Sequence, residues 1–492
     1  MTSTTVALAK RQSAPGAYRP VVLAMALTGL LGVMRIDASL ELVGYLLVVV
    51  TAFLPAILWT WGGSKGIPVL AAMGAMHLIF YALPVAMRNP MVSEYSAWEV
   101  WRAEATVSLF LLVATLASAA LTGGSESNRK PRWDWSVDSQ IARFAIVGLA
   151  TGLAFQVALI SGWLSVFGSS FGVVRAIGFT CSAAGAYALG IARARGRLHG
   201  LAWQVAVTAL GATVAVSWSG LFLVMGLVFG AAAVFGYAAS SRRVPWRAVV
   251  PVFIVVFVLH AGKAEMRDRY WEPGIQGGGA HSLREIPGFA AEWIGTGMSA
   301  LAAGSMGQDV VDRAALLQML LFVQQRTPDQ VPFLGGATYA LLPGMLIPRF
   351  LAPEKIASQA AMTLLNVHYG IQTEESASQT AIGWGPIAEA FANFGYIGVI
   401  GAALFIGLFA AAMTRWSAAT PGFSLPTVMA IAAMTNLINL EADLTYQIMN
   451  LWVSLVAAFM FFAAFRAIVP AGDGARARGR FNTQGRVKLP TP

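Results

Sequence analysis

The chain has almost no cysteine and little charge for its length. Cys181 is the single cysteine among 492 residues, which excludes both an intrachain disulfide and a cysteine-based metal site. Charged side chains make up 11% of the residues, whereas soluble domains carry about 25%. Hydrophobic residues make up 57%. This composition excludes an ordinary soluble protein and indicates an integral membrane protein.

Apolar runs long enough to cross a bilayer recur along the chain, since a spanning helix needs about 20 mostly apolar residues. About nine such runs come first, at 20–36, 40–61, 67–87, 104–122, 141–164, 171–191, 201–217, 220–239 and 247–261. About three more follow a long polar segment, at 392–413, 424–440 and 446–465. We therefore predict an all-α polytopic membrane protein with about 12 transmembrane helices.

These runs divide the chain into five parts. The parts are a tail at 1–19, transmembrane helices at 20–261, a long external loop at 262–385, further transmembrane helices at 386–466 and a basic tail at 467–492. The first residues, MTSTTVALAKRQSAPGAYRP, lack the apolar stretch and cleavage site of a secretory signal peptide. We expect both tails to be disordered.

Basic residues sit mainly in short loops between the predicted spans. The positive-inside rule assigns these loops to the cytoplasm, together with both termini. The residues that set this orientation are Lys10, Arg11, Arg19, Lys65, Arg129, Lys130, Arg132, Arg193, Arg195, Arg197, Arg242, Arg243 and Arg415. The formal net charge of +10 comes without aromatic-basic interleaving or a folded basic domain, so we expect no nucleic-acid partner.

With this orientation the long segment 263–384 faces the exterior, which in a bacterium is the periplasm. Three of its stretches, GFAAEWIGTGMSALAAG, VVDRAALLQMLLFVQQ and ATYALLPGMLI, carry apolar residues at helical spacing. They are too short or too interrupted to span, so we expect short amphipathic helices at the membrane interface.

External basic side chains near a membrane suit a phosphate or pyrophosphate at headgroup level. The candidates are Arg267, Arg269, Arg313, Arg326, Arg349 and Lys355. Ordinary solvated or snorkelling side chains are the alternative for each of them.

Carboxylates are candidates for a general base. They are Glu389, Glu441, Asp443, Asp37 and Glu41. We favour Glu389, because GWGPIAEAFANFG places it one turn inside a helix that enters the bilayer, where an acid is costly. Most of the others are better explained as interfacial or helix-start acids.

Neither a metal site nor a cofactor is predicted. His260, His281 and His368 share no ligand spacing. Asp309 and Asp312 fit either a divalent cation or, more simply, the acidic first turn of a helix.

Two stretches carry recognisable motifs. In 312–355 the matching residues are Pro328, Pro332, Phe333, Gly335, Tyr339, Pro348, Arg349, Pro353 and Lys355. In 380–407 they are Glu389, Asn393, Phe394, Gly395 and Gly398. The chain resembles the bacterial Wzy-type oligosaccharide repeat-unit polymerases and, more distantly, the O-antigen ligases. It departs from the family at Ala352, where an aromatic residue is usual, and at Ile356, where proline is usual.

The resemblance implies polymerisation of undecaprenyl-pyrophosphate-linked oligosaccharide units at the outer face of the inner membrane, without a nucleotide sugar or cofactor. It also implies contact with membrane lipid and with a chain-length regulator protein. KAEMRDRYW resembles the start of the family's external loop and adds Lys263. We expect Glu389 to be catalytic. The side chains expected to bind the pyrophosphate are Lys263, Arg267, Arg313, Arg349 and Lys355.

Two alternatives remain open. An O-antigen ligase, or a GT-C-like transferase using one lipid-linked sugar, would still be a glycan transferase. The GT-C-like form would place its base at Asp37 or Glu41. A transporter or flippase would suit about a dozen helices, but the predicted spans carry little charge besides Arg143 and Arg175, and no internal repeat is visible.

Overall fold

The computed structural model describes residues 19–122, 135–270, 282–303, 316–347, 351–352, 354–379, 382–420 and 422–469. Within these ranges the fold is helical, and the only β-pairing is an isolated bridge between Ser136 and Ser424. This agrees with the predicted all-α class. Residues 1–18 and 470–492 of the predicted tails lie outside the described residues, as do Arg313, Arg349, His281, Asp309 and Asp312.

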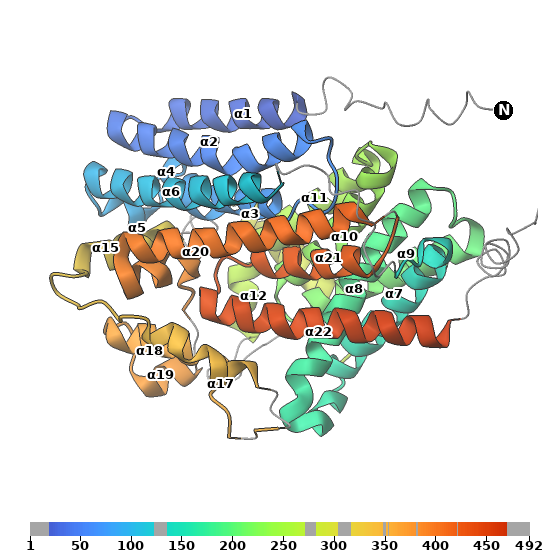
Figure 1. Cartoon of the computed structure of the whole chain (residues 1–492). Helices are drawn as coiled ribbons and strands as arrows, with labels where there is room; N and C mark the ends of the chain where they lie inside the picture. Colours follow the sequence, from blue (N-terminus) through green and yellow to red (C-terminus); the bar gives the residue numbers. More distant parts are fainter. Residues whose placement is uncertain are drawn as a thin grey trace, which may run out of the picture.

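The helices fall into two groups along the chain, one before and one after the start of the long segment (Figure 1). The first group is α1 (Arg19–Arg35), α2 (Ser39–Trp61), α3 (Val69–His77), α4 (Leu83–Ala86), α5 (Pro90–Ser93), α6 (Ala97–Thr122), α7 (Ile141–Ile160), α8 (Phe171–Ala194), α9 (Gly200–Trp218), α10 (Leu223–Ser241) and α11 (Trp246–Ala261). The second group is α12 (Lys263–Tyr270), α13 (Ile286–Ala302), α15 (Leu316–Arg326), α16 (Ala337–Ala340), α17 (Leu342–Leu346), α18 (Ala360–His368), α19 (Glu374–Gln379), α20 (Gly385–Ala419), α21 (Leu425–Leu437) and α22 (Leu444–Ile468). A π-helical turn, Leu78–Ala82, joins α3 to α4.

Nine helices of the described chain are long and apolar enough to cross a membrane, with α3 to α4 counted as one. The number is ten if α11 and α12, which meet at an angle of 52°, form one broken span. The predicted count of about 12 is not reached. Helix α1 has 17 residues and α21 only 13, which is short for a bilayer about 30 Å thick. The coarser prediction, a multi-pass helical membrane protein, is confirmed.

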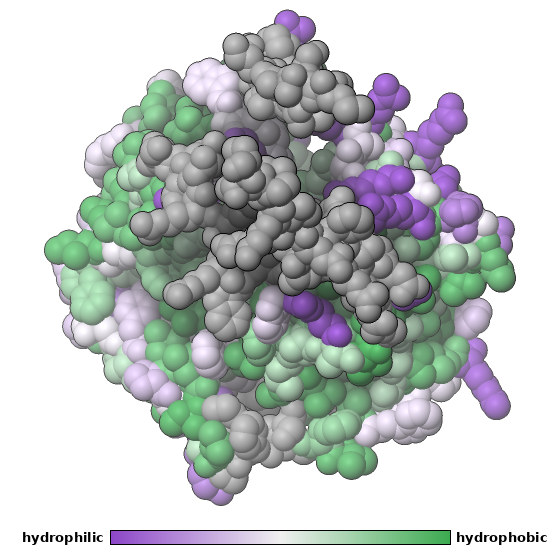
Figure 2. All heavy atoms as spheres, turned by 45° about the vertical axis from the view of Figure 1, so that its right-hand side comes forward, coloured by the Kyte–Doolittle hydropathy of each residue, from purple (hydrophilic) through white to green (hydrophobic). Residues whose placement is uncertain are grey.

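The bundle core is built on helix-to-helix packing around α6 and α20. Helix α6 packs against both α2 and α20, and α20 also packs against α21 and α22 (Figure 1). Helices α7, α8 and α10 form a second packed layer that joins this core through α22 and α21. Figure 2 shows hydrophobic side chains over much of the visible face, with hydrophilic ones gathered in separate clusters, as expected where lipid surrounds a bundle.

Several described residues in or beside the predicted cytoplasmic loops lie together at one end of the bundle. Asp138 accepts a 2.5 Å hydrogen bond from Arg195 and a 3.0 Å hydrogen bond from the backbone N–H of Phe423. Arg415 donates to the carbonyl of Leu121. Ser417, half a turn further on, accepts from the N–H of Ile67. Which side of the membrane this end faces stays a prediction.

The opposite end of the bundle carries the long segment. Gln325 of α15 donates a 3.2 Å hydrogen bond to Glu99, and Arg102 donates a 3.0 Å bond to the carbonyl of Gln324. Helix α15 also packs against α5 and α20. The predicted short helices therefore exist, as α13, α15, α16 and α17, and α15 is seated in the bundle core rather than on its surface.

Helix α20 is two helices joined at a break. Phe394 (φ −142°, ψ 18°) and Gly395 (φ 59°, ψ −142°) have non-helical backbone angles. A short helix up to Asn393 is followed by a long apolar helix that continues to Ala419. The predicted span 392–413 corresponds to the helix after the break, and the break itself is not predicted.

Candidate active site

Glu389 lies in the short first part of α20, where every residue from Gly385 to Asn393 is buried. Its side chain is 0% exposed. Burying a carboxyl is costly unless other polar groups bind it, so its neighbours identify the site. Trp384 anchors the start of this short helix by donating a 2.6 Å hydrogen bond to Asn366 of α18.

The first turn of α22 binds the Glu389 carboxyl. The Thr445 hydroxyl donates a 2.6 Å hydrogen bond to Oε1, and the Thr445 backbone N–H donates a 3.2 Å bond to Oε2. This turn forms because Asp443 caps the helix: its Oδ1 accepts a 2.7 Å bond from the N–H of Tyr446. An unpaired N–H at a helix start is a natural partner for a carboxylate.

The loop that precedes α16 fills the break in α20. The N–H groups of Leu334 and Gly335 donate 3.0 and 3.1 Å bonds to the carbonyls of Ala392 and Asn393, which the break leaves without helical partners. The Asn393 side chain then accepts a 3.1 Å bond from the N–H of Gly336. It also donates a 2.8 Å bond to the hydroxyl of Thr338.

Glycine is required on both sides of this junction. Gly395 has a positive φ, and a Cβ there would lie 3.2 Å from the ring of Phe333. Gly336 also has a positive φ, and a Cβ there would lie 2.8 Å from the ring of Phe394. The two motif-bearing stretches are thus fitted together at the break that follows Glu389.

Two further polar groups face the same buried region. Asp443 is fully buried, and neither its Oδ2 nor the Tyr339 hydroxyl has a hydrogen-bond partner among the described residues. Burial raises the pKa of the Asp443 carboxyl above its ordinary range. The pKa of Tyr339 is raised by burial first and then by the negative charges of Glu389 and Asp443. The three groups therefore lie close enough to influence one another electrostatically.

The predicted pyrophosphate ligands are spread over different parts of the structure. Lys355 donates 2.7 and 2.9 Å bonds to the carbonyls of Met345 and Ile347, at the end of α17, which packs against α22. Arg267 donates a 3.3 Å bond to the carbonyl of Leu221 and lies 5.5 Å from the ring centre of Phe222.

Lys263 and Arg267 belong to a region separate from Glu389. Both lie on α12, which packs against α11 and α13 around a small hydrophobic cluster of its own. The residues around Glu389 belong to the main core. The structure brings Lys355 towards the α22 side of the candidate site, whereas α12 holds the other two basic residues elsewhere.

The remaining candidates have local partners. Arg269 pairs with Glu265 at 2.7 Å and with Glu292 at 2.5 Å. Arg326 stacks 4.2 Å from the ring centre of Phe322. The described part of the chain holds no group of three or more His, Cys, Asp and Glu side chains placed to bind a metal ion.

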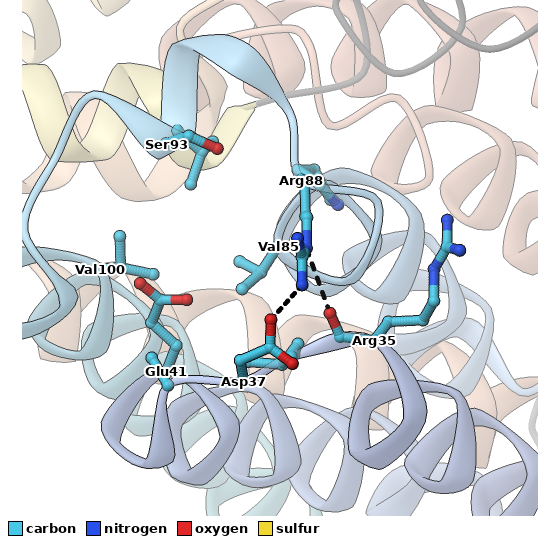
Figure 3. A pocket seen from close by; sticks show the side chains of 11 residues that line it. Arg35, Asp37, Glu41, Val85, Arg88, Ser93 and Val100 are labelled. Atoms are coloured by element: carbon cyan, nitrogen blue, oxygen red, sulfur yellow. Dashed lines mark hydrogen bonds and ion pairs between the residues drawn. The ribbon is translucent and has the colours of Figure 1, made fainter.

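Asp37 and Glu41 lie at a different place from Glu389. Asp37 forms an ion pair with Arg88, and both residues line a cavity that also contains Glu41 (Figure 3). This cavity lies between the start of α2 and the turn that follows α4.

Two buried polar side chains, Thr445 and Glu104, were not predicted from the sequence. Thr445 binds the carboxyl of a residue 56 positions away, and no sequence pattern signals that contact. The predicted span 104–122 begins at Glu104, yet α6 begins at Ala97 and buries Glu104 completely. Neither of its carboxyl oxygens has a hydrogen-bond partner among the described residues. The predicted spans are therefore less free of charge than expected.

Comparison with known proteins does not identify a family for the chain. No family model, curated protein or solved structure matches it. Function is therefore argued from the geometry around Glu389 and from the motif resemblance.

Proposed function

We propose that the protein polymerises lipid-carrier-linked oligosaccharide repeat units at the outer face of a bacterial inner membrane, with both termini in the cytoplasm. The observation that carries the proposal is the junction at the α20 break. Two stretches with polymerase-like motifs, about 55 residues apart in the chain, bind each other there through Asn393. They enclose a buried carboxyl, Glu389, at the end of the bundle that carries the long segment.

The reaction needs one base and one stabilised leaving group. A hydroxyl of the acceptor sugar attacks the anomeric carbon of the growing glycan, forming a new C–O bond. The bond from that carbon to the undecaprenyl pyrophosphate breaks, and the pyrophosphate leaves with the electron pair. In the proposal the Glu389 carboxylate accepts the hydroxyl proton.

The neighbours of Glu389 have supporting roles. Thr445 fixes the carboxyl orientation through its 2.6 Å bond, which keeps one oxygen in a constant position. Asp443 and Tyr339 present polar atoms without hydrogen-bond partners among the described residues, which are available to the hydroxyls of a bound sugar. Membrane lipid surrounds the site, and a chain-length regulator protein is the partner that such an activity implies.

The developing charge on the pyrophosphate requires cations. We keep Lys263, Arg267, Arg313, Arg349 and Lys355 as the proposed set. Lys355 would need the smallest rearrangement. Its ammonium group could give up its hydrogen bonds to two backbone carbonyls and bind phosphate oxygens while staying near α17 and α22. Lys263 and Arg267 would require α12 to approach the site when substrate binds.

The proposal is tested in cells of the natural host by replacing Glu389 with alanine. We expect single repeat units to accumulate on the lipid carrier and long polysaccharide to disappear at normal protein levels. Glu441→Gln is the matched control, since Glu441 is an exposed acid in the loop that also holds Asp443. Normal chain lengths in the Glu389 variant would refute the assignment.

Transport of a glycolipid is a second candidate, favoured by two specific observations. Transporters use broken helices and buried acids at their substrate sites. The chain has both, in the α20 break and in the buried Glu104. Proteoliposomes that move a lipid-linked oligosaccharide across the bilayer, without forming any glycosidic bond, would favour this candidate over the polymerase.

A further inference from the structure

A polar cavity lies apart from Glu389, at the end of the bundle that carries the long segment. Its volume is about 270 Å³, and it is bordered by the end of α1, the start of α2, the α4–α5 turn and α6. The polar side chains on its wall come from Asp37, Glu41, Arg88 and Ser93, and Arg35 also borders it (Figure 3). The apolar part of the wall includes Val85 and Val100.

Arg88 occupies a backbone position that normally requires glycine. The N–H of Arg88 donates 3.0 Å to the carbonyl of Val85, and the N–H of Asn89 donates 2.9 Å to the carbonyl of Pro84. These two bonds are the Schellman pattern that ends a helix, with Arg88 as its left-handed residue at φ 51°. A side chain is disfavoured there, so the contacts of the Arg88 guanidinium are the feature to explain.

The guanidinium of Arg88 points into the cavity. It donates to Asp37 and, at 3.4 Å, to the backbone carbonyl of Arg35. Figure 3 shows the Arg35 side chain turned away from the cavity, while the Glu41 carboxylate points into the space below Ser93. The Arg88–Asp37 pair is at the mouth, with side chains 66% and 87% exposed, so the pair is weak and opens easily.

The charges in the cavity select the kind of ligand. The Asp37 and Glu41 carboxylates outnumber the single guanidinium that points inward, so a phosphate group would meet net repulsion. A sugar ring is neutral, and its hydroxyls both donate and accept. They can donate to Glu41 while they accept from Arg88. The volume is just below the range of about 300–1,000 Å³ of pockets for drug-sized ligands, which suits a single ring.

We propose that this cavity is a glycan subsite, in which Glu41 and Arg88 hold one sugar ring of the lipid-linked oligosaccharide. The inference rests on the proposed function for the source of the sugar. Helix α15 connects the two places, because it packs against α5 beside the cavity and against α20, which carries Glu389. One ring held here would keep a repeat unit at the end of the bundle that carries the long segment, the same end as Glu389.

The test is a binding titration with the full chain in lipid nanodiscs, read by saturation-transfer NMR. The probes are the methyl glycosides of glucose, galactose, N-acetylglucosamine and N-acetylgalactosamine, with inorganic phosphate as the anion probe. At least one glycoside is expected to bind. Its binding is expected to weaken about tenfold in Glu41→Ala and in Arg88→Ala, the effect of losing a hydrogen bond to a charged group. Arg35→Ala is the matched control and should change it less than about twofold.

A second substitution separates binding from folding. Arg88→Gly removes the same guanidinium but fits the left-handed backbone, so it should melt at a higher temperature than Arg88→Ala while binding sugar equally weakly. Absence of glycoside binding, or binding unchanged in the Glu41 and Arg88 variants, would overturn the proposal. So would phosphate binding that Arg88→Ala abolishes while no glycoside binds. The titration needs no polymerisation, so its outcome is independent of the catalytic role of Glu389.

Discussion

The hydroxyl of Thr445 donates a 2.6 Å hydrogen bond to the carboxyl of Glu389, although the two residues are 56 positions apart. The bond joins the first turn of α22 to the short helix that precedes the α20 break. Both side chains are fully buried. A carboxyl held in this way has a fixed orientation, which a general base needs.

Removing that hydrogen bond should slow polymerisation without removing the base. Thr445→Val has nearly the same shape but no hydroxyl, and we expect polymer formation about tenfold slower. Thr445→Ser keeps the hydroxyl and should stay within about threefold of the parent rate. The measurement is the initial rate of polymer formation at equal protein levels. Equal rates for the valine and serine variants would show that the bond has no part in the reaction.

The α20 break predicts a contrast between two glycines on one helix. Gly395→Ala places a side chain at φ 59° and ψ −142°, next to Phe333, so we expect a loss of at least about 2 kcal/mol in unfolding free energy. Gly401→Ala is the control, because a Cβ there meets no atom within 4 Å. It should be neutral or slightly stabilising.

Unfolding of both variants in detergent, followed by circular dichroism, measures this contrast. Similar unfolding midpoints for Gly395→Ala and Gly401→Ala would mean that α20 runs unbroken through Phe394. The docking of the Leu334 to Gly336 loop at Asn393 would then have to be abandoned as well.

Asp443 predicts a pH dependence of stability. Burial raises the pKa of its carboxyl in the folded protein. As pH rises above the ordinary aspartate pKa of about 3.9, the unfolded chain releases this proton first, so the folded state loses stability until its own raised pKa is passed.

Asp443→Asn removes the titration but still caps α22. Between about pH 4 and pH 7 its melting temperature should therefore fall less than that of the parent protein. If the melting temperatures of the two proteins change with pH in the same way across that range, the burial of an ionisable Asp443 is contradicted. A steeper fall in the variant would contradict the sign of the shift.

Gly44 and Glu104 should be energetically coupled. A Cβ on Gly44 would lie 2.3 Å from Glu104 Oε2, so Gly44→Ala is expected to destabilise the fold by more than about 1 kcal/mol. In a Glu104→Ala background the clash with the carboxyl is gone, and the cost of Gly44→Ala should be at least halved. A double-mutant cycle of unfolding free energies measures the coupling. Strict additivity would show that the two side chains do not meet.

The sequence predicted the helices better than it predicted their interruptions. Apolar runs locate α2, α6, α8 and α22, because lipid requires every backbone group of a span to be paired within the helix. The same runs overestimated α21, whose apolar residues are buried against protein and need not cross a full bilayer. The α20 break depends on a docked loop from elsewhere in the chain, and a local pattern does not contain that information.

The candidate site was predictable only in part, for the same reason. Glu389 was found because an acid among apolar residues is costly wherever it lies. Thr445 and Thr338 were not found, because their role depends on contacts made by folding. The motif resemblance groups Lys263 and Arg267 with Glu389, yet α12 packs with α11 and α13 around a separate hydrophobic cluster.

The most direct test of the account uses the purified protein in proteoliposomes with its lipid-linked repeat unit and follows polymer formation over time. Glu389→Gln preserves the shape of the side chain but cannot accept the proton, and we predict a rate at least about a hundredfold lower, with Glu441→Gln unchanged. A Glu389→Gln protein that polymerises at the parent rate would contradict the account.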